Sequence, residues 1–150
     1  MDKTEVVKIK GIANLDDFTG EVALFPLPSV VFFPHTFLPL KIFEPRNKQM
    51  VKEAMEKEKM IGMVLLKPGW DRNYFGNPDI YDVAGLGRIV KLESIEDGKY
   101  NLVLYGLKRV RILEIVQELP YRVARVEIME EQPCEGEALM KQRIMSLVSR

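Results

Sequence analysis

The stretch from Leu24 to Arg46, LFPLPSVVFFPHTFLPLKIFEPR, decides the fold of this chain. Apolar, β-branched and aromatic residues dominate it, and prolines interrupt it at short intervals. Proline has no backbone N–H for a sheet ladder, so prolines in such a stretch belong at strand ends, edges or turns. The pattern predicts two short buried strands between residues 22 and 33, joined by a turn at 26–29, and a third strand at 37–43.

A helix is predicted directly after this stretch, at residues 45–58. Pro45 suits the first helical position, and Glu44 places a negative charge near the helix N-terminus. Apolar residues recur at helical spacing from Met50 to Met55, with Lys and Glu residues between them. The apolar run that follows predicts a buried strand at 61–66.

The second half of the chain changes to a period of two, which is typical of strands. We predict strands at 86–95, 100–115 and 122–129. Asp97-Gly98 joins the first two as a hairpin turn that requires positive φ at both central residues. Gly106, inside the second of these strands, predicts a bulge or bend.

The two ends of the chain differ from this β-rich middle. Residues 1–20 are polar and lean toward acidic, which predicts a flexible N-terminal arm. Near the other end, apolar residues at helical spacing predict a C-terminal helix, whose apolar stripe either docks back on the β region, meets another chain or begins a longer helical segment. The expected organisation is an arm at 1–20, a β-rich domain at 21–133 and a helix at 134–150.

Length and composition describe an ordinary globular chain of one domain. The chain has 150 residues, of which 47% are hydrophobic and 29% charged. Lys plus Arg and Asp plus Glu are both 22, so the formal net charge is zero and the basic excess typical of a nucleic-acid binder is missing. The sequence shows no signal peptide and no apolar run of ~18–20 residues that could cross a bilayer. We therefore expect a cytoplasmic protein without membrane contact.

Motifs for catalysis and metal binding are not found in the sequence. The phosphate-binding loop, the dinucleotide-binding glycine pattern and the serine-hydrolase motif are all missing. The single cysteine, Cys134, and the single histidine, His35, cannot form a multi-cysteine metal site. The position of His35 after a proline is typical of a turn histidine, and a Cys134–His35 pair would lack a third orienting group. We expect no enzymatic activity, no cofactor and no metal.

Three aromatic residues are candidates for binding. Trp70, Tyr74 and Phe75 lie within residues 68–80, a segment rich in Gly, Pro, Asn and Asp that predicts a loop. Aromatic side chains gathered in such a loop either form an interaction surface or fold back over the end of the β region. The sequence leaves both interpretations open.

A group of basic residues offers a second candidate surface. Lys108, Arg109 and Arg111 lie on one predicted strand. A solvated sheet face is the ordinary interpretation of such a group. A surface for phosphate groups or an acidic partner is the alternative.

The stretch from Leu24 to Arg46 resembles the opening of the Lon amino-terminal domain. The segments 83–90 (VAGLGRIV), 97–112 (DGKYNLVLYGLKRVRI) and 121–127 (YRVARVE) resemble the β half of that domain in the same order. The resemblance covers about residues 22–130. It implies an α+β fold, namely a PUA-like open β-barrel with one inserted helix, followed by the start of a helical subdomain.

The sequence departs from the family in three respects. A chain of 150 residues leaves no room for the ATPase module or the serine–lysine protease domain of Lon. The helical part stops after one predicted helix, which suggests a truncated or shortened form. The family often carries Arg-Tyr after Glu-Pro, whereas this chain has Arg46-Asn47.

The resemblance implies a domain that selects substrates. We predict a non-catalytic protein- or peptide-recognition domain that binds unfolded or degron-bearing polypeptides, or a partner protein, through an apolar groove or an open β edge. The predicted binding residues are Trp70, Tyr74 and Phe75, with Glu44 and Arg46 added by resemblance to the family motif. An RNA-binding module of PUA-like fold and an interaction scaffold without preference for unfolded substrates are the alternatives.

Overall fold

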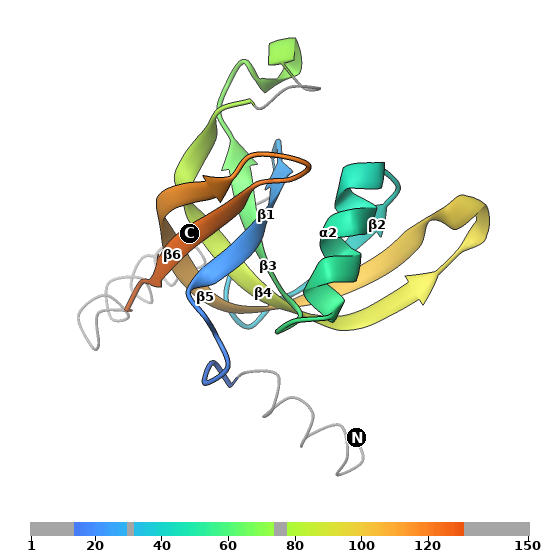
Figure 1. Ribbon diagram of the computed structural model, residues 1–150, viewed down its shortest axis with the longest axis horizontal. Helices are drawn as coiled ribbons and strands as arrows, with labels where there is room; N and C mark the ends of the chain where they lie inside the picture. Colours follow the sequence, from blue (N-terminus) through green and yellow to red (C-terminus); the bar gives the residue numbers. More distant parts are fainter. Residues whose placement is uncertain (1–13, 30–31, 74–77, 131–150) are drawn as a thin grey trace, which may run out of the picture.

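Six strands and one α-helix form the described part of the chain, which covers residues 14–29, 32–73 and 78–130 of a computed structural model. The elements are β1 (Glu21–Leu27), β2 (Phe37–Ile42), α2 (Pro45–Met55), β3 (Met60–Leu66), β4 (Ile80–Ser94), β5 (Tyr100–Gln117) and β6 (Val123–Ile128) (Figure 1). Two short 3-10 helices, Trp70–Asn73 and Glu96–Gly98, lie in the connections on either side of β4. Within the described ranges, no helix has the length and apolar character needed to cross a membrane.

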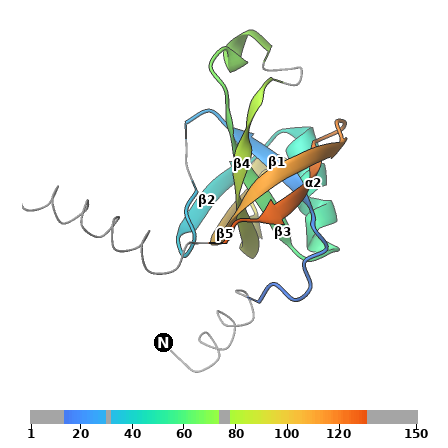
Figure 2. The ribbon, with the colours of Figure 1, turned by 90° about the vertical axis from the view of Figure 1, so that its left-hand side faces the viewer.

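All six strands belong to one sheet with the order β2-β5-β4-β3-β1-β6. β1 and β3 are parallel, and the other pairs are antiparallel. β6 also pairs with β5, so strand pairing runs from β5 through β4, β3, β1 and β6 back to β5. The length of β5 allows this, because its first half pairs with β2 and its second half with β6. Figures 1 and 2 show the strands curving around the interior, with α2 packed to one side.

Two groups of buried side chains fill the interior. α2 contributes Met50, Val51 and Ala54 to the first group, which also contains Phe25 of β1 and Ile61 of β3. The second group comes from β1, β3, β4, β5 and β6, with alternate residues on every strand except β5, whose register shifts beside Gly106. Its most deeply buried members are Leu24, Val64, Leu86, Val110 and Ala124.

Most predicted elements are present, with shifted ends. The helix predicted at 45–58 ends at Met55, because Lys59 adopts a positive φ of 63° and its N–H bonds to a carbonyl of the last turn. The strand predicted from residue 86 already begins at Ile80, which pairs with β3 across a β-bulge. The strands predicted at 37–43, 61–66, 100–115 and 122–129 are confirmed to within two residues at each end.

The turn predicted at 26–29 is confined to a bend at Pro28 and Ser29, and the second short strand is not present at residues 32–33. β1 continues through Pro26 to Leu27, paired in parallel with β3. Pro26 is tolerated because β6 pairs only with the first part of β1, so the missing N–H interrupts no ladder. Phe32 and Phe33 follow in irregular chain, and residues 30–31 lie outside the described ranges.

Glycines of β4 and β5 explain where Phe32 and Phe33 lie instead. A Cβ atom on Gly106 would overlap the carbonyl oxygen of Phe33, and one on Gly85 would lie 2.6 Å from the carbonyl oxygen of Phe32. The segment therefore lies directly against both strands, and the Phe32 side chain is buried. The irregularity predicted at Gly106 is confirmed, since the register of β4 and β5 shifts beside it.

The hairpin turn between β4 and β5 has the predicted conformation. Asp97 and Gly98 have positive φ angles of 63° and 68°. The hairpin extends past α2 (yellow in Figure 1). At the chain ends, Leu15 and Phe18 pack against the second group of buried side chains. The helix predicted at 134–150 lies outside the described residues, and the predicted domain boundaries stay predictions.

Candidate functional site

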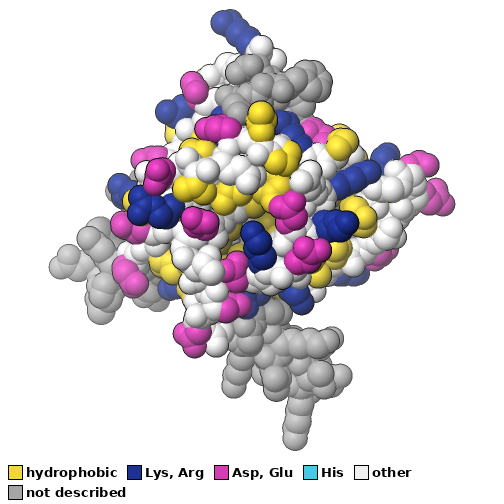
Figure 3. Space-filling model, in the orientation of Figure 1, with side chains coloured by type: hydrophobic (Ala, Val, Ile, Leu, Met, Phe, Trp, Pro, Cys, Tyr) yellow, Lys and Arg dark blue, Asp and Glu magenta, His cyan; other side chains and the backbone are white. Residues whose placement is uncertain are grey.

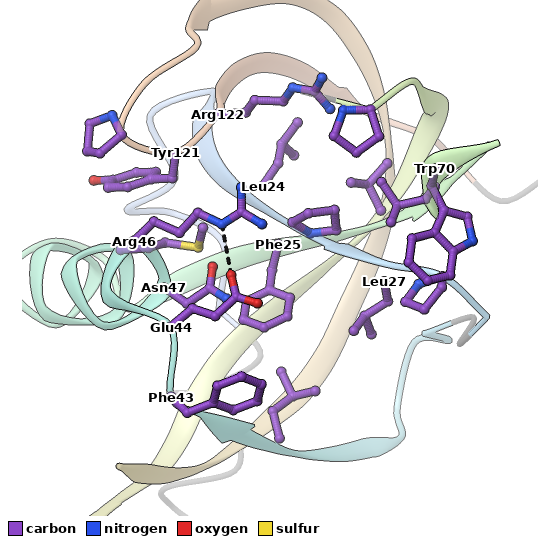
Figure 4. Close-up of a pocket in the computed structure, with 18 of the residues that line it drawn as sticks. Leu24, Phe25, Leu27, Phe43, Glu44, Arg46, Asn47, Trp70, Tyr121 and Arg122 are labelled. Atoms are coloured by element: carbon purple, nitrogen blue, oxygen red, sulfur yellow. Dashed lines mark hydrogen bonds and ion pairs between the residues drawn. The ribbon is translucent and has the colours of Figure 1, made fainter. Parts of the chain in front are cut away.

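A pocket of about 410 Å³ opens between β1 and the N-terminal end of α2 (Figure 4). We call it the β1–α2 pocket. Its lining comes from β1, the β2–α2 connection, β3, the 3-10 helix after β3 and the segment that precedes β6. Most of the wall is apolar and includes Phe25, Leu27, Leu40, Phe43, Leu66 and Trp70. In the space-filling view of Figure 3, hydrophobic side chains gather over β1 beside α2, with charged side chains around them.

The pairing of β1 explains why a pocket forms at this place. β6 pairs with β1 only over residues 21–23, followed by a hydrogen bond from the Leu24 N–H to the Arg122 carbonyl. Beyond Leu24, the chain before β6 turns away through Tyr121 and Pro120, and none of the described strands pairs with β1 on this side. The resulting gap is bounded by α2 and by the end of β2, so apolar side chains of β1 border an open space.

Glu44 and Arg46 form an ion pair within the β1–α2 pocket. Arg46 Nε donates to Glu44 Oε2 at 3.0 Å, and the two side chains are 30% and 22% exposed, respectively. Pro45 between them is the first residue of α2, which places both charges at the same helix end. Figure 4 shows the pair between Trp70 at one end of the pocket and Tyr121 at the other.

Two further basic residues line the pocket. Arg122 is 13% exposed, and its Nε lies 3.6 Å from an oxygen of the exposed Glu118 side chain. Lys41, near the end of β2, is exposed. Among the charged lining residues, the basic ones (Lys41, Arg46 and Arg122) outnumber the acidic one, Glu44. With Glu118 beside Arg122 counted as well, the pocket combines apolar walls with a small excess of positive charge.

The structure brings three of the five predicted binding residues together. Glu44, Arg46 and Trp70 all line the β1–α2 pocket, although Trp70 is far from the other two in sequence. Trp70 is half-buried at the start of a 3-10 helix, and the buried Pro78 lines the same pocket. Tyr74 and Phe75 lie outside the described residues.

Sequence reasoning missed the residues that the segment before β6 contributes. Tyr121 and Arg122 line the pocket next to Pro120, and their only signal in the sequence was their position after a proline at the start of a strand. The Tyr121 hydroxyl donates a hydrogen bond to Glu53 Oε2 of α2. Burial raises the pKa of the Tyr121 hydroxyl, and the hydrogen bond to Glu53 raises it further. Tyr121 therefore stays protonated and connects the segment before β6 to α2.

The predicted basic group on β5 does not form a single surface. Arg109 and Arg111 are exposed, whereas Lys108 is partly buried. Neighbouring residues of a strand point to opposite faces, which separates Lys108 from the two arginines. Arg109 also lies over the ring of Phe33, with its guanidinium carbon 5.6 Å from the ring centroid.

Within residues 14–29, 32–73 and 78–130, no group of three or more His, Cys, Asp or Glu residues is arranged to hold a metal ion. His35 lies in a turn, as predicted, with a φ of 66°, and its Nδ1 lies 3.3 Å from the Tyr105 hydroxyl. Cys134 lies outside the described residues. Chemically, the β1–α2 pocket offers apolar contact, charge and hydrogen bonding.

Comparison with known proteins identifies the family of this chain. The family described as the ATP-dependent protease La (LON) substrate-binding domain matches residues 21–150. The chain belongs to this family. The Lon protease of Anaeromyxobacter dehalogenans is 35% identical over 120 residues, which are 80% of this chain. Lon protease 2 of Myxococcus xanthus is 35% identical over 121 residues, or 81% of this chain. The chain spans about 14% of the length of each of these relatives.

Solved structures show the same fold at low sequence identity. A Lon N-terminal domain protein from Xanthomonas campestris has a TM-score of 0.62 and 22% identity, covering 85% of this chain and 73% of that one. The N-terminal domain of the Mycobacterium avium complex Lon protease has a TM-score of 0.63 and 13% identity, covering 87% and 68%. The mostly-strand sheet with one helix is thus the architecture of a Lon N-terminal domain.

The β1–α2 pocket of this Lon substrate-binding domain is built largely from the stretch that decides its fold. Residues between Leu24 and Asn47 supply more than half of the lining, and the rest comes from Met50 of α2, β3, the 3-10 helix after it, Pro78 and the segment before β6. The site and the fold therefore depend on the same part of the sequence.

Proposed function

We propose that this Lon-type domain recognises polypeptide segments through the β1–α2 pocket and has no catalytic activity of its own. The match to the substrate-binding family over residues 21–150 carries the proposal. The pocket supports it, because apolar walls with a few polar groups are typical of binding sites, and its volume lies within the roughly 300–1,000 Å³ range of such sites.

We further propose that the circuit of β5, β4, β3, β1 and β6 is an open β-barrel of the PUA-like type, with α2 as its inserted helix. The pairing of β6 with both β1 and β5 supports this. In such an arrangement the β1–α2 pocket occupies a break in the wall of the barrel, where β1 no longer pairs with β6. The predicted helical subdomain would follow β6.

The partners that we propose are unfolded or degron-bearing polypeptides. The relatives are Lon proteases, and their family model describes a substrate-binding domain. We propose that a bound segment is passed on for proteolysis by a catalytic module that this chain does not match. The cytoplasmic location stays a prediction.

Trp70 provides the test of this function. We expect Trp70→Ala to weaken the binding of a reduced and alkylated, permanently unfolded protein at least about tenfold, or ~1.4 kcal/mol. Large aromatic side chains at the end of an apolar pocket contribute most to such contacts. The melting temperature should stay nearly unchanged, because Trp70 is only half-buried and lies outside both groups of core side chains. Isothermal titration calorimetry and thermal denaturation measure the two quantities on the same variant.

Phe37→Ala is the matched control, since Phe37 is an aromatic residue that is 59% exposed and does not line the β1–α2 pocket. It should leave the affinity unchanged. A loss of stability in Trp70→Ala without a specific loss of affinity would mean that the loop only covers the β region. Binding of single-stranded RNA that weakens with salt, without binding of the unfolded protein, would favour the RNA-binding alternative instead.

A further inference from the structure

The edge of β1 that borders the pocket cannot pair with a complete extra strand. The Leu24 N–H bonds to the Arg122 carbonyl, so Leu24 directs its peptide groups toward this side. Peptide groups alternate between the two edges of a strand, and the next residue directed to this side is Pro26. β1 ends at Leu27, and Pro28 follows it in a bend. Because proline has no N–H, this edge offers a carbonyl acceptor beyond Leu24 but no donor.

This absence of donors decides how a polypeptide can bind in the β1–α2 pocket. Addition of a strand to a sheet needs alternating donors and acceptors along the edge. With Pro26 at the one position of β1 beyond Leu24 that is directed to this side, and Pro28 directly after the strand, the edge is protected against strand addition. A bound segment must therefore be held by its side chains, and the apolar walls formed by Phe25, Leu27 and Trp70 suit a large apolar side chain.

The charges around the pocket decide which neighbours that side chain can have. Lys41, Arg46 and Arg122 line the pocket, Glu44 pairs with Arg46, and Glu118 pairs with Arg122, so the basic groups exceed these carboxylates by one. Arg46 and Arg122 are each less than one-third exposed, so their interactions are screened less by salt than those of surface charges. A carboxylate beside the apolar side chain would be attracted, and an ammonium group would be repelled.

We propose that the β1–α2 pocket is specific for an unfolded segment in which a large apolar side chain is followed by an acidic residue. The inference rests on the proposed function and adds to it the substrate class and the mode of contact. The apolar side chain fills the space between β1 and Trp70. The acidic side chain lies toward Arg46 and Arg122, and no strand is added to β1.

Three short peptides test the proposal. They share a Leu-Phe core, are acetylated and amidated so that their ends carry no charge, and have Glu, Gln or Lys after the core. Trp70 is the only tryptophan of the chain, so its fluorescence reports binding at the pocket when the peptides contain none. We expect the Glu peptide to bind at least about threefold more tightly than the Gln peptide, and the Lys peptide to bind most weakly.

Charge variants identify the source of this preference. Lys41→Gln and Arg122→Gln should each reduce the ratio of Glu to Gln affinity toward one. Lys41 is exposed, so its substitution keeps the fold even if Arg122→Gln lowers the melting temperature. Arg125→Gln is the matched control, because Arg125 pairs with Glu114 outside the pocket and should leave the ratio unchanged.

The outcomes separate this inference from the proposed function. Equal binding of the three peptides, or tighter binding of the Lys peptide, would overturn the acidic preference and leave a general polypeptide-binding function in place. A Glu preference that persists in both pocket variants would show that residues outside the pocket produce it, and this outcome would also overturn the inference. If no peptide binds and the unfolded protein does not bind either, both proposals fail.

Discussion

Tyr121 and Glu53 connect two segments that are distant in sequence at one end of the β1–α2 pocket. The hydrogen bond from the Tyr121 hydroxyl holds the pKa of Glu53 below its ordinary value, and a second hydrogen bond from Gln49 lowers it further. A carboxyl group whose pKa is lower in the folded state stabilises the fold above its unfolded pKa. That contribution is lost as the pH falls through the folded pKa.

The stability of the fold should therefore depend on pH in the acidic range. We expect the wild-type chain to lose stability relative to Glu53→Gln as the pH falls below about 4.5, the ordinary pKa of the group. The amide does not titrate, so its stability should change less over the same range. Urea unfolding midpoints measured at pH 7 and at progressively lower pH provide the comparison.

Tyr121→Phe serves as the second variant for this test, because it removes the hydroxyl donor while keeping the buried ring. This variant should also lose less stability than the wild-type chain as the pH falls. Parallel profiles for the wild-type chain and both variants would rule out a contribution from this pair.

Gly98 is the residue on which the β4–β5 hairpin turn depends. Its φ of 68° lies in the left-handed region, which a β-branched residue adopts only with strain. A Cβ atom at this position would meet only the Lys48 Nζ, at 3.4 Å, so backbone strain rather than steric overlap determines the cost. We expect Gly98→Val to lower the free energy of unfolding by roughly 1–3 kcal/mol, measured by chemical denaturation.

Asp97→Gly is a useful companion to Gly98→Val. Asp97 also has positive φ, so glycine at that position should cause no loss of stability through backbone strain. An unchanged unfolding midpoint in Gly98→Val would contradict the assignment of the turn.

At the scale of elements, the segment that connects β1 to β2 is held by contact with glycines. The His35 N–H donates to the Gly106 carbonyl at 2.8 Å, and the Gly106 N–H donates to the Thr36 carbonyl at 2.9 Å. The backbone of Phe33 lies so close to Gly106 that no side chain fits between them. The path of this segment toward β2, whose last residues border the pocket, thus depends on a missing side chain in β5.

Gly106→Ala tests this packing. The added methyl group would overlap the Phe33 carbonyl oxygen, and backbone atoms cannot move aside as easily as the end of a flexible side chain. We expect a loss of about 1–3 kcal/mol in the free energy of unfolding, the usual cost of overpacking. Leu113→Ala on the same strand is the control and should change little, because Leu113 is 47% exposed. Equal stability of the two variants would show that the segment can shift without cost.

At the scale of the whole molecule, stability comes from apolar packing inside a continuous circuit of strands. The described residues contain two groups of buried apolar side chains and no group of side chains arranged to bind a metal. Each of the five strands in the circuit pairs with two others of the circuit, and β5 also pairs with β2. Edges of sheets, which invite aggregation, are reduced by this closure.

We expect the β region to fold without metal, nucleotide or disulfide. Its melting temperature should be the same, within error, with and without a chelator or a reductant, because nothing in the proposed stabilisation depends on either. Differential scanning calorimetry of the dialysed protein makes the measurement. A large drop in melting temperature on adding the chelator would reveal a structural metal.

The sequence by itself determined most of the local elements and the family. Strands, the helix after Glu44 and the turn at Asp97-Gly98 follow from side-chain period and from the backbone restrictions of proline and glycine, which act between neighbouring residues. The same local patterns carried the resemblance between Leu24 and Arg46. These properties need no information about distant contacts.

Only the tertiary structure decided how the elements close and where the pocket lies. Three features join residues that are far apart in the chain. They are the pairing of β6 with β5, the packing of Phe32 against Gly85, and the position of Trp70, Arg46 and Arg122 around one pocket. Each depends on register, curvature and close packing, which a local pattern does not specify. The function proposed for this domain therefore rests on contacts that appear only when the sheet has closed around its core.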